Sequence, residues 1–369
     1  MGRLIHQLNL HAGEWVEVRS KEEVLGTLDD HGRLEELPFM PEMLKYCGER
    51  LRVVSRAHKT CDPPNGLRGR RMLNAVHLEG IRCDGQAHGG CQAGCLIFWK
   101  EAWLRRACEG ASVAQDARRN FPALVSKSES APCCTEQKVQ AGVFALGEPP
   151  DPMNPTYACQ STQLSQATLP LHWWDLRQYW EDYTSGNVGA SQIAAAFLYF
   201  LYHKCAEAGL GFGSLMRWAY DRFQAIRGGS PYPSRIGRIP TGTRTPSVRL
   251  DLQPGELVRV KSYQEILDTL DEDSHNRGLY FDPEAVPFCS KVFRVHARIQ
   301  KLINEKTGKM LHLKNDALVL ENVFCQSRYA THRRFCPRAI YSYWREIWLE
   351  RIPDSSRTEA TQPTSPLAE

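Results

Sequence analysis

Four of the thirteen cysteines in this 369-residue chain gather in its first third. Cys61 is followed by Cys83, Cys91 and Cys95, and the text RCDGQAHGGCQAGC sets the last three sulfurs in a C-x7-C-x3-C pattern. The glycines and alanines between these sulfurs let the chain wrap closely around a metal centre. Four thiolates suit tetrahedral zinc or an iron–sulfur cluster. The sequence therefore predicts a first metal site at Cys61, Cys83, Cys91 and Cys95.

The spacing favours an iron–sulfur cluster, with zinc as the alternative, because a zinc ribbon uses paired C-x2-C knuckles. The run from Cys83 to His88 is similar to the CDGSH iron–sulfur motif. It has one extra residue before the histidine and no upstream C-x-C, so that family's properties are not carried over. His58, His77 and His88 are candidate ligands, donors to the ligands or proton carriers, and ordinary surface histidines are the alternative.

An internal duplication organises the chain around these residues. GEWVEVRS from Gly13 matches GELVRVKS 242 residues later, and WKEAWL from Trp99 matches WREIWL 245 residues later. The register holds across more than seventy residues with one three-residue insertion in the second copy. Self-similarity of this kind marks a repeated structural unit. The chain therefore contains a tandem repeat at 10–108 and 252–352.

The second repeat keeps two cysteines, Cys325 and Cys336. It has isoleucine at the two positions equivalent to Cys61 and Cys95. Three other cysteines are candidates to supply the two missing ligands: Cys133 and Cys134 in the text APCC, and Cys159 in the text YACQ. We therefore predict a second site, with His332 as an alternative fourth ligand and a metal-free repeat as the alternative interpretation. Its cysteines are Cys134, Cys159, Cys325 and Cys336.

Periodicity predicts small mixed repeats. Alternation indicates strands at 15–18, 52–57 and 75–82, and a short helix follows Ser20. The text CLIFWKEAWLRR predicts a helix at the end of the repeat. Short strands and tight turns favour an α+β fold with two small SH3-like β-barrel repeats that carry C-terminal helices. The recurrence of Glu101 and Glu346 at matched places favours a structural role such as a salt bridge.

The segments between and after the repeats differ in composition. Residues 109–171 form an irregular linker with cysteines, and 172–226 form a helical segment that joins the repeats. A basic linker rich in proline and glycine covers 227–251, and the tail at 353–369 is predicted to be disordered.

Composition excludes several classes of protein. The chain is 42% hydrophobic and 24% charged, which excludes a disordered chain, and its net charge of +4 gives no general case for nucleic acid. Nucleic acid is therefore not favoured as a partner, and a protein partner is expected. The longest apolar run, from Ile193 to Tyr202, is half of the roughly 20 residues that a membrane span needs. No signal-peptide pattern is present, so we expect a cytoplasmic protein with reduced thiols.

The texts LPFMPEMLKYCG, RCDGQAHGGCQAGCLIFWKEAW and FCPRAIYSYWREIW resemble a family of uncharacterised bacterial proteins with tandem cysteine-bearing repeats, and this resemblance transfers no activity. Phosphate-loop, dinucleotide, zinc-protease and serine-hydrolase motifs are absent. We therefore predict an iron–sulfur protein that transfers electrons or assists a biosynthetic oxidoreductase. A zinc-stabilised SH3-like module that binds protein or nucleic acid is the alternative. A metal enzyme with an open coordination position near His77 or His88 is a third hypothesis.

Overall fold

The computed structural model describes residues 7–66, 68–107, 134–146, 151, 153–208 and 211–353. The chain divides into two compact units. The first unit runs to residue 210 and includes 301–312 and 326–340, and the second holds the remaining residues. Two segments of the second repeat therefore belong to the first unit. The predicted tail beyond 353 and residues 109–133 of the irregular linker lie outside the described residues.

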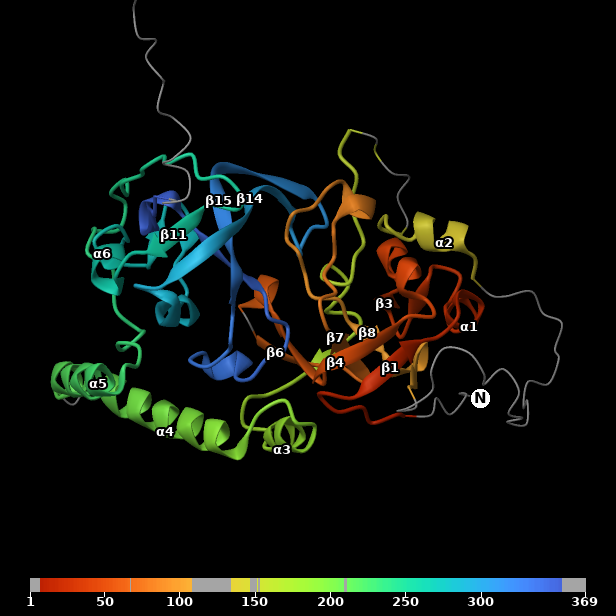
Figure 1. The fold of residues 1–369 in the computed structure, drawn as a ribbon, viewed down its shortest axis with the longest axis horizontal. Coiled ribbons are helices and arrows are strands. Elements are labelled where there is room, and N and C mark those ends of the chain that lie inside the picture. Colours follow the sequence, from red (N-terminus) through yellow and green to blue (C-terminus); the bar gives the residue numbers. More distant parts are fainter. Residues whose placement is uncertain are drawn as a thin grey trace, which may run out of the picture. The chain divides into compact units, whose positions relative to one another are not determined.

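The first repeat forms a five-stranded antiparallel sheet with the strand order β8-β7-β4-β1-β9 (Figure 1). A capping box starts its short helix, because the Ser20 hydroxyl accepts from the Glu23 amide and the Glu23 carboxylate accepts from the Ser20 amide. The elements are β1 (Trp15–Val18), α1 (Lys21–Leu25), β2 (Arg33–Leu34), β3 (Leu37–Pro38), η1 (Pro41–Tyr46), β4 (Arg50–Arg56), β7 (Ala75–Leu78), β8 (Trp99–Lys100), η4 (Glu101–Trp103) and β9 (Leu104–Arg106).

The second repeat has the same elements in the same sheet order, β16-β15-β14-β11-β17. Adding 242, or 245 after the insertion, to the first repeat's numbers gives the bounds of most of these elements, whereas β14 and β15 are longer and β16 begins earlier. The matched sequences therefore form matching elements. The elements are β11 (Leu257–Val260), α6 (Tyr263–Leu267), β12 (His275–Asn276), β13 (Leu279–Tyr280), η5 (Pro283–Phe288), β14 (Val292–Ile303), β15 (Met310–Phe324), β16 (Tyr341–Trp344), η7 (Glu346–Trp348) and β17 (Leu349–Arg351).

The helix predicted at 95–106 is wrong. The segment forms β8, one 3-10 turn and β9, which lie at opposite ends of the sheet order. Its tryptophans, Trp99 and Trp103, are fully buried and both meet the Phe39 ring edge-on. Tertiary packing of large aromatic side chains outweighs the helical spacing here. None of the sheets in the described ranges closes into a barrel, so the SH3-like form of the repeats stays a prediction.

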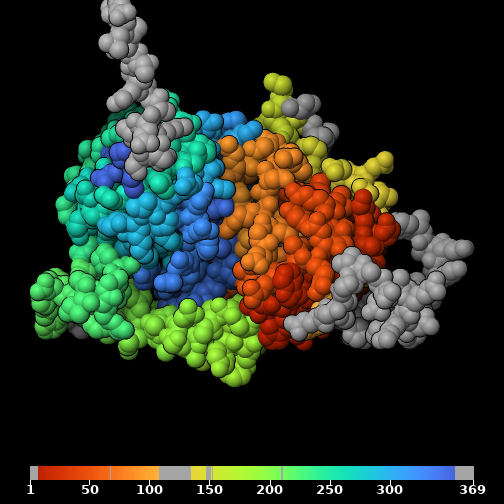
Figure 2. Space-filling model, viewed as in Figure 1, coloured from red at the N-terminus to blue at the C-terminus, as the bar shows by residue number. Residues whose placement is uncertain are grey.

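Each repeat has its own hydrophobic core. In the first, Val16 and Val18 of β1 are fully buried, as the predicted alternation requires, and they pack with the two tryptophans. In the space-filling view the red and orange segments of the first repeat lie against one another at the surface (Figure 2). In the second, Val258 and Val260 occupy the equivalent places.

A buried carboxylate ties the start of each repeat to its end. The Glu101 carboxylate accepts from the backbone amides of Leu8, Asn9 and Leu10 at 2.8–3.1 Å and pairs with Arg56 at 2.9 Å. Glu346 does the same with residues 250–252 and pairs with its arginine, Arg298, at 2.7 Å. The predicted structural role of this glutamate pair is therefore confirmed.

Glu101→Gln is expected to lower the free energy of unfolding by about 2 kcal/mol, because an amide cannot accept at both of its terminal atoms and hydrogen bonds to a charged group are worth more than neutral ones. Urea unfolding measures the difference. Glu79→Gln, at an exposed position of the same repeat, is the matched control. Equal unfolding midpoints for the two variants would contradict the role of Glu101.

Further elements lie in the hairpin of the first repeat, in the cysteine-rich loops and in the middle of the chain. β5 (Lys59–Asp62), η2 (Pro63–Asn65) and β6 (Arg68–Arg71) form a hairpin that β10 (Leu169–Pro170) extends to a three-stranded sheet. η3 (Gln86–His88) lies in the cysteine-rich loop, and η6 (Thr331–Arg333) lies among the first-unit residues of the second repeat. The helices between the repeats are α2 (Glu136–Ala141), α3 (Arg177–Thr184), α4 (Ala190–Glu207) and α5 (Gly213–Arg227).

The segment 172–226 thus contains three helices, and 228–250 contains no helix or strand. Among the described residues, the helices are all too short or too polar to reach across a bilayer.

Candidate metal centre

The cysteine-rich loop is closed at its base by a hydrogen bond from the Cys83 amide to the Cys95 carbonyl at 2.8 Å. Inside it the chain turns tightly at Gly85, whose φ is +71°. A Cβ atom at this glycine would lie 1.8 Å from the carbonyl oxygen of Cys91, so no other residue fits without moving the loop. The glycine therefore brings the backbone between Cys83 and Cys91 into close contact.

Four thiols at this loop lie close enough for charge on one to act on another. They are Cys83, Cys91, Cys95 and Cys159, the last from the segment after α2. Burial is the largest cause of the raised pKa of Cys83, Cys95 and Cys159, and it raises the pKa of Cys159 to about 12. Charge on Cys95 adds to the rise at Cys83 and Cys159, and charge on Cys91 adds to the rise at Cys95 and Cys159. Cys83, Cys95 and Cys159 therefore stay protonated at neutral pH unless a cation binds them.

Two of the four sulfurs receive hydrogen bonds, and backbone amides act on the other two. The amide of Ile303 donates to Cys91 at 3.3 Å, and the Ser161 hydroxyl donates to Cys95 at 3.3 Å. Against the larger effect of burial, the Gly85 amide lowers the pKa of Cys83, and the amides of Ser161 and Thr162 lower the pKa of Cys159. Donors aimed at sulfur stabilise a thiolate over a thiol and set the potential of iron–sulfur clusters.

A buried cation lies beside this group. The Arg338 guanidinium is 2% exposed and donates to the Ser161 hydroxyl at 3.0 Å, to the Glu305 carboxylate at 2.6 Å and to the Cys61 carbonyl at 3.1 Å. Its charge lowers the pKa of both Cys61 and Cys95, against the stronger effect of burial. The arginine can therefore balance part of the negative charge of deprotonated thiolates.

Cys61 takes part in a different pair. Its buried thiol is hydrogen-bonded to that of Cys336, and this bond, together with burial, raises the pKa of Cys61 well above the ordinary value for cysteine. Cys336 is likewise buried. The structure therefore joins one cysteine from each predicted site, while the place expected for Cys61 beside the loop is taken by Cys159.

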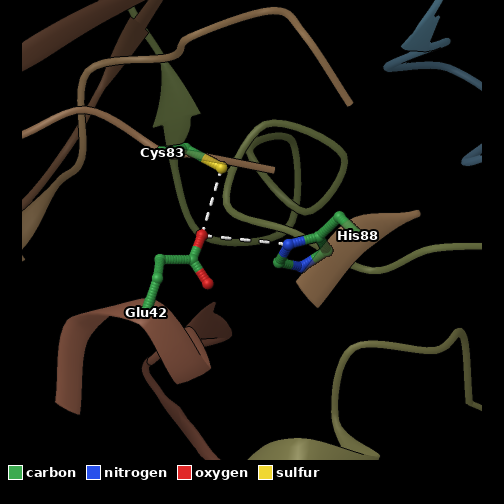
Figure 3. Close-up of side chains that lie close together, drawn as sticks. All are labelled: Glu42, Cys83 and His88. Atoms are coloured by element: carbon green, nitrogen blue, oxygen red, sulfur yellow. Dashed lines mark hydrogen bonds and ion pairs between the residues drawn. The ribbon is translucent and has the colours of Figure 1, made fainter. Parts of the chain in front are cut away.

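A compact mixed group of ligands lies at the edge of the loop. The ligand atoms of Glu42, Cys83 and His88 lie within 4.8 Å of one another (Figure 3). The Cys83 thiol donates to Glu42 Oε1 at 3.1 Å, and His88 Nδ1 lies 3.8 Å from the same oxygen. Nε2 of His88 donates to the Ala158 carbonyl at 3.3 Å, which leaves the Nδ1 lone pair directed at the carboxylate. Burial lowers the pKa of His88 and favours this neutral form.

The distances between ligand atoms differ between the four thiols and the group of Glu42, Cys83 and His88. Three thiolates on one zinc ion, each at about 2.3 Å, stand about 3.8 Å apart. Within the described residues, the Glu42, Cys83 and His88 atoms are the one set of three or more metal-binding side chains gathered within 4.8 Å. The four thiols are therefore spaced more widely than ligands of a single zinc ion. An iron–sulfur cluster, in which no three thiolates share one iron, requires such spacing.

The other predicted ligands are placed elsewhere. Cys134 is fully buried in the core of the first repeat, where burial raises its pKa and its thiol donates to the Thr135 carbonyl at 3.6 Å. Cys325 belongs to the second unit, whereas Cys336 belongs to the first. Cys159 lies with the loop cysteines, so the structure does not gather the predicted second set as a group within one unit.

The predicted histidines have separate environments. His58 is buried immediately before β5, with Nε2 3.2 Å from both the Gln178 carbonyl and the Asp182 carboxylate. His77 is fully buried and bonded through Nδ1 to the Ile97 carbonyl at 2.8 Å. His332 lies on η6, beside a cavity described below. Of the four histidines, only His88 is in the compact group of metal-binding atoms that the described residues form.

Sequence reasoning missed three residues of the site: Glu42, Ser161 and Arg338. Glu42 recurs as Glu284 in the second repeat, and this recurrence is the sequence signal that could have identified it. Both glutamates are buried in the structure. Arg338 follows Cys336 by two residues in the text FCPRA, but its approach to Ser161 depends on the tertiary fold.

No protein-family model matches this chain, and a search of curated proteins finds no significant similarity to it.

Proposed function

We propose that the protein carries an iron–sulfur cluster on Cys83, Cys91, Cys95 and Cys159 and that it transfers electrons to a partner oxidoreductase in the cytoplasm. The observation that carries this proposal is the set of polar donors at the four sulfurs, with hydrogen bonds to Cys91 and Cys95 and amides that lower the pKa of Cys83 and Cys159. A thiol that served only to fill the core would not need them.

Charge and spacing support the same assignment. Four thiolates on a cluster leave a net negative charge, and the buried guanidinium of Arg338 lies where it offsets that charge. The wide spacing of the thiols fits ligands bound to different iron ions. The bound cluster supplies one-electron chemistry. The protein's own residues hold the thiolates, donate hydrogen bonds to them and limit their contact with water.

A second candidate is a mononuclear zinc site on Glu42, Cys83 and His88, which stabilises the first repeat and leaves recognition to other surfaces. The buried Oε2 of Glu42 and Nδ1 of His88, which have no hydrogen-bond partner among the described residues, favour it. Carboxylate, thiolate and imidazole are all ordinary zinc ligands. Both candidates use Cys83, so they exclude one another.

Anaerobic purification followed by measurement of iron, acid-labile sulfide and zinc per chain tests the proposal. We expect brown protein with iron and sulfide in equal amounts and little zinc. Colourless protein with about one zinc ion per chain would replace the cluster with the second candidate. Protein with neither metal would overturn both.

A variant pair separates the candidates further. The double substitution Glu42→Gln and His88→Asn removes two ligands of the zinc candidate and none of the cluster candidate. We expect this variant to keep its iron and sulfide. The control, Cys205→Ser at an exposed position of α4, tests whether substitution alone changes the metal content.

A further inference from the structure

A cavity of about 770 Å³ in the first unit has no role in the proposed cluster. Its walls come from the β5–β6 hairpin, from the segment 170–174 before α3, and from His332 on η6. The volume lies within the range of about 300–1,000 Å³ that small-molecule sites occupy. The cavity therefore has room for a ligand of ordinary metabolite size.

The three walls meet at a position that requires glycine. The amide of Leu171 donates to the Gly69 carbonyl at 3.0 Å. A Cβ atom at Gly69 would lie 2.9 Å from the Leu171 carbonyl oxygen and 3.0 Å from that of His332. Because both neighbours are backbone atoms, they cannot move aside cheaply, and the close junction of the walls depends on this glycine.

The segment before α3 is fixed by the helix that follows it. The side-chain amide of Gln178 donates to the His172 carbonyl at 2.9 Å, and the Tyr179 hydroxyl donates to the Trp173 carbonyl at 2.7 Å. The imidazole of His172 stacks on the Trp174 indole at 4.3 Å with an interplanar angle of 12°. This wall is thus a rigid aromatic surface, although the Trp174 side chain is 59% exposed.

Positive charge lines the hairpin wall. Arg70 is anchored to the hydroxyl and carbonyl of Thr168 at 2.8 and 2.7 Å. The exposed side chain of Arg68 has no counter-ion among the described residues. The acid in this lining is Asp62, which is buried and accepts from Asn65 at 2.8 Å. The two arginines and this aspartate therefore favour an anionic ligand over a cationic one.

From the stacked aromatic wall and the unpaired arginine we propose that this cavity binds a small anion that bears a flat ring, of the kind that nucleoside monophosphates represent. The ring stacks on Trp174, and the anionic group pairs with Arg68. The site lies beside the thiol pair, because Asp62 follows Cys61 on β5. The proposal does not depend on the identity of the metal.

Isothermal titration of the full-length, anaerobically purified protein with adenosine monophosphate, adenosine and inorganic phosphate tests this inference. We expect the monophosphate to bind about tenfold or more tightly than either adenosine or phosphate alone, since each lacks one of the two recognised groups. Adenosine binding as tightly as the monophosphate would overturn the role of the anion. No binding of the monophosphate at millimolar concentration would overturn the site.

Two variants locate the binding. Arg68→Gln and Trp174→Ala are each expected to raise the dissociation constant of the monophosphate by about tenfold. Arg177→Gln and Trp180→Ala replace exposed residues of the same types that do not line the cavity, and they should leave it unchanged. Binding that survives both cavity substitutions would place the nucleotide elsewhere and overturn the proposal, whether or not the protein holds iron.

Discussion

Cys159→Ser protein is expected to contain almost no iron or labile sulfide, whereas Cys61→Ser protein keeps both. Charge on Cys95 and Cys91 acts on the Cys159 thiol, and the amides of Ser161 and Thr162 lower its pKa against the larger effect of burial. Cys61 instead bonds to Cys336. Loss of one of four thiolate ligands normally prevents a stable cluster. Iron and sulfide analysis after anaerobic purification, together with the visible spectrum, measures the outcome.

The comparison uses variants that change one sulfur each, with Cys134→Ser as a control at a buried cysteine outside the four-thiol group. Serine in a buried site costs stability, so thermal unfolding of each protein is measured beside its iron content. If Cys61→Ser protein lost its iron and Cys159→Ser protein kept it, the ligands would be the four cysteines that the sequence predicts, with Cys61 in place of Cys159. Equal retention in both would contradict either four-cysteine set.

The repeats could be predicted well because their signal is local and occurs twice. Val16 and Val18 alternate with polar residues, and the matched text in the second copy forms the matched strand β11. The structure at the end of the first repeat could not be predicted, because the spacing of Trp99 and Trp103 suits a helix as well as a turn between two strands. Their edge-on packing on Phe39 decides the structure, and that contact joins residues sixty apart.

The metal site could be predicted only as far as its loop. Cys83, Cys91 and Cys95 lie within one short segment, so their spacing reports their proximity. Cys159 follows Cys95 by 64 residues, and no periodicity relates the two. A tertiary contact places Cys159 with the first repeat, because the side chain of the adjacent Gln160 donates to the Phe98 and Pro38 carbonyls at 2.9 and 3.1 Å. This buried side chain fixes the segment against the first repeat.

The two repeats share some structural features and differ in others. The buried glutamate, the tryptophan indole bonded to a threonine hydroxyl and the sheet order occur in both copies. The β5–β6 hairpin of the first copy corresponds to the end of β14 and the start of β15, and the cysteine-rich loop corresponds to residues 325–340. The framework is therefore shared, while the candidate metal and ligand sites depend on side chains that only one copy carries.

His77 is one such addition, since the equivalent position of the second repeat holds the buried Val319. The His77 ring packs on Phe98 at 4.6 Å, and its Nε2 has no hydrogen-bond partner among the described residues. Burial, together with the charges of Arg82 and Arg338, lowers the pKa of His77 to about 4, although the hydrogen bond to the Ile97 carbonyl acts in the opposite direction. The imidazole is therefore neutral in the folded protein at neutral pH.

The protein is expected to lose about 3 kcal/mol of unfolding free energy through His77 as the pH falls from about 6.5 to about 4. In that window the unfolded chain binds a proton at this residue and the folded chain does not, so acid favours unfolding. Above pH 7 both states are neutral, and the residue adds no pH dependence. Urea unfolding at several pH values measures the slope.

Three proteins isolate this contribution: the natural sequence, His77→Val and His312→Val. His77→Val copies the residue of the second repeat and is expected to flatten the acid slope, even though the unpaired Ile97 carbonyl lowers its stability at every pH. His312 is exposed, so its replacement should leave the slope of the natural protein unchanged. Since all three proteins lose metal in acid alike, the difference between their slopes reports the histidine. A slope shared by all three would mean that His77 takes up a proton in the folded state as readily as in the unfolded one.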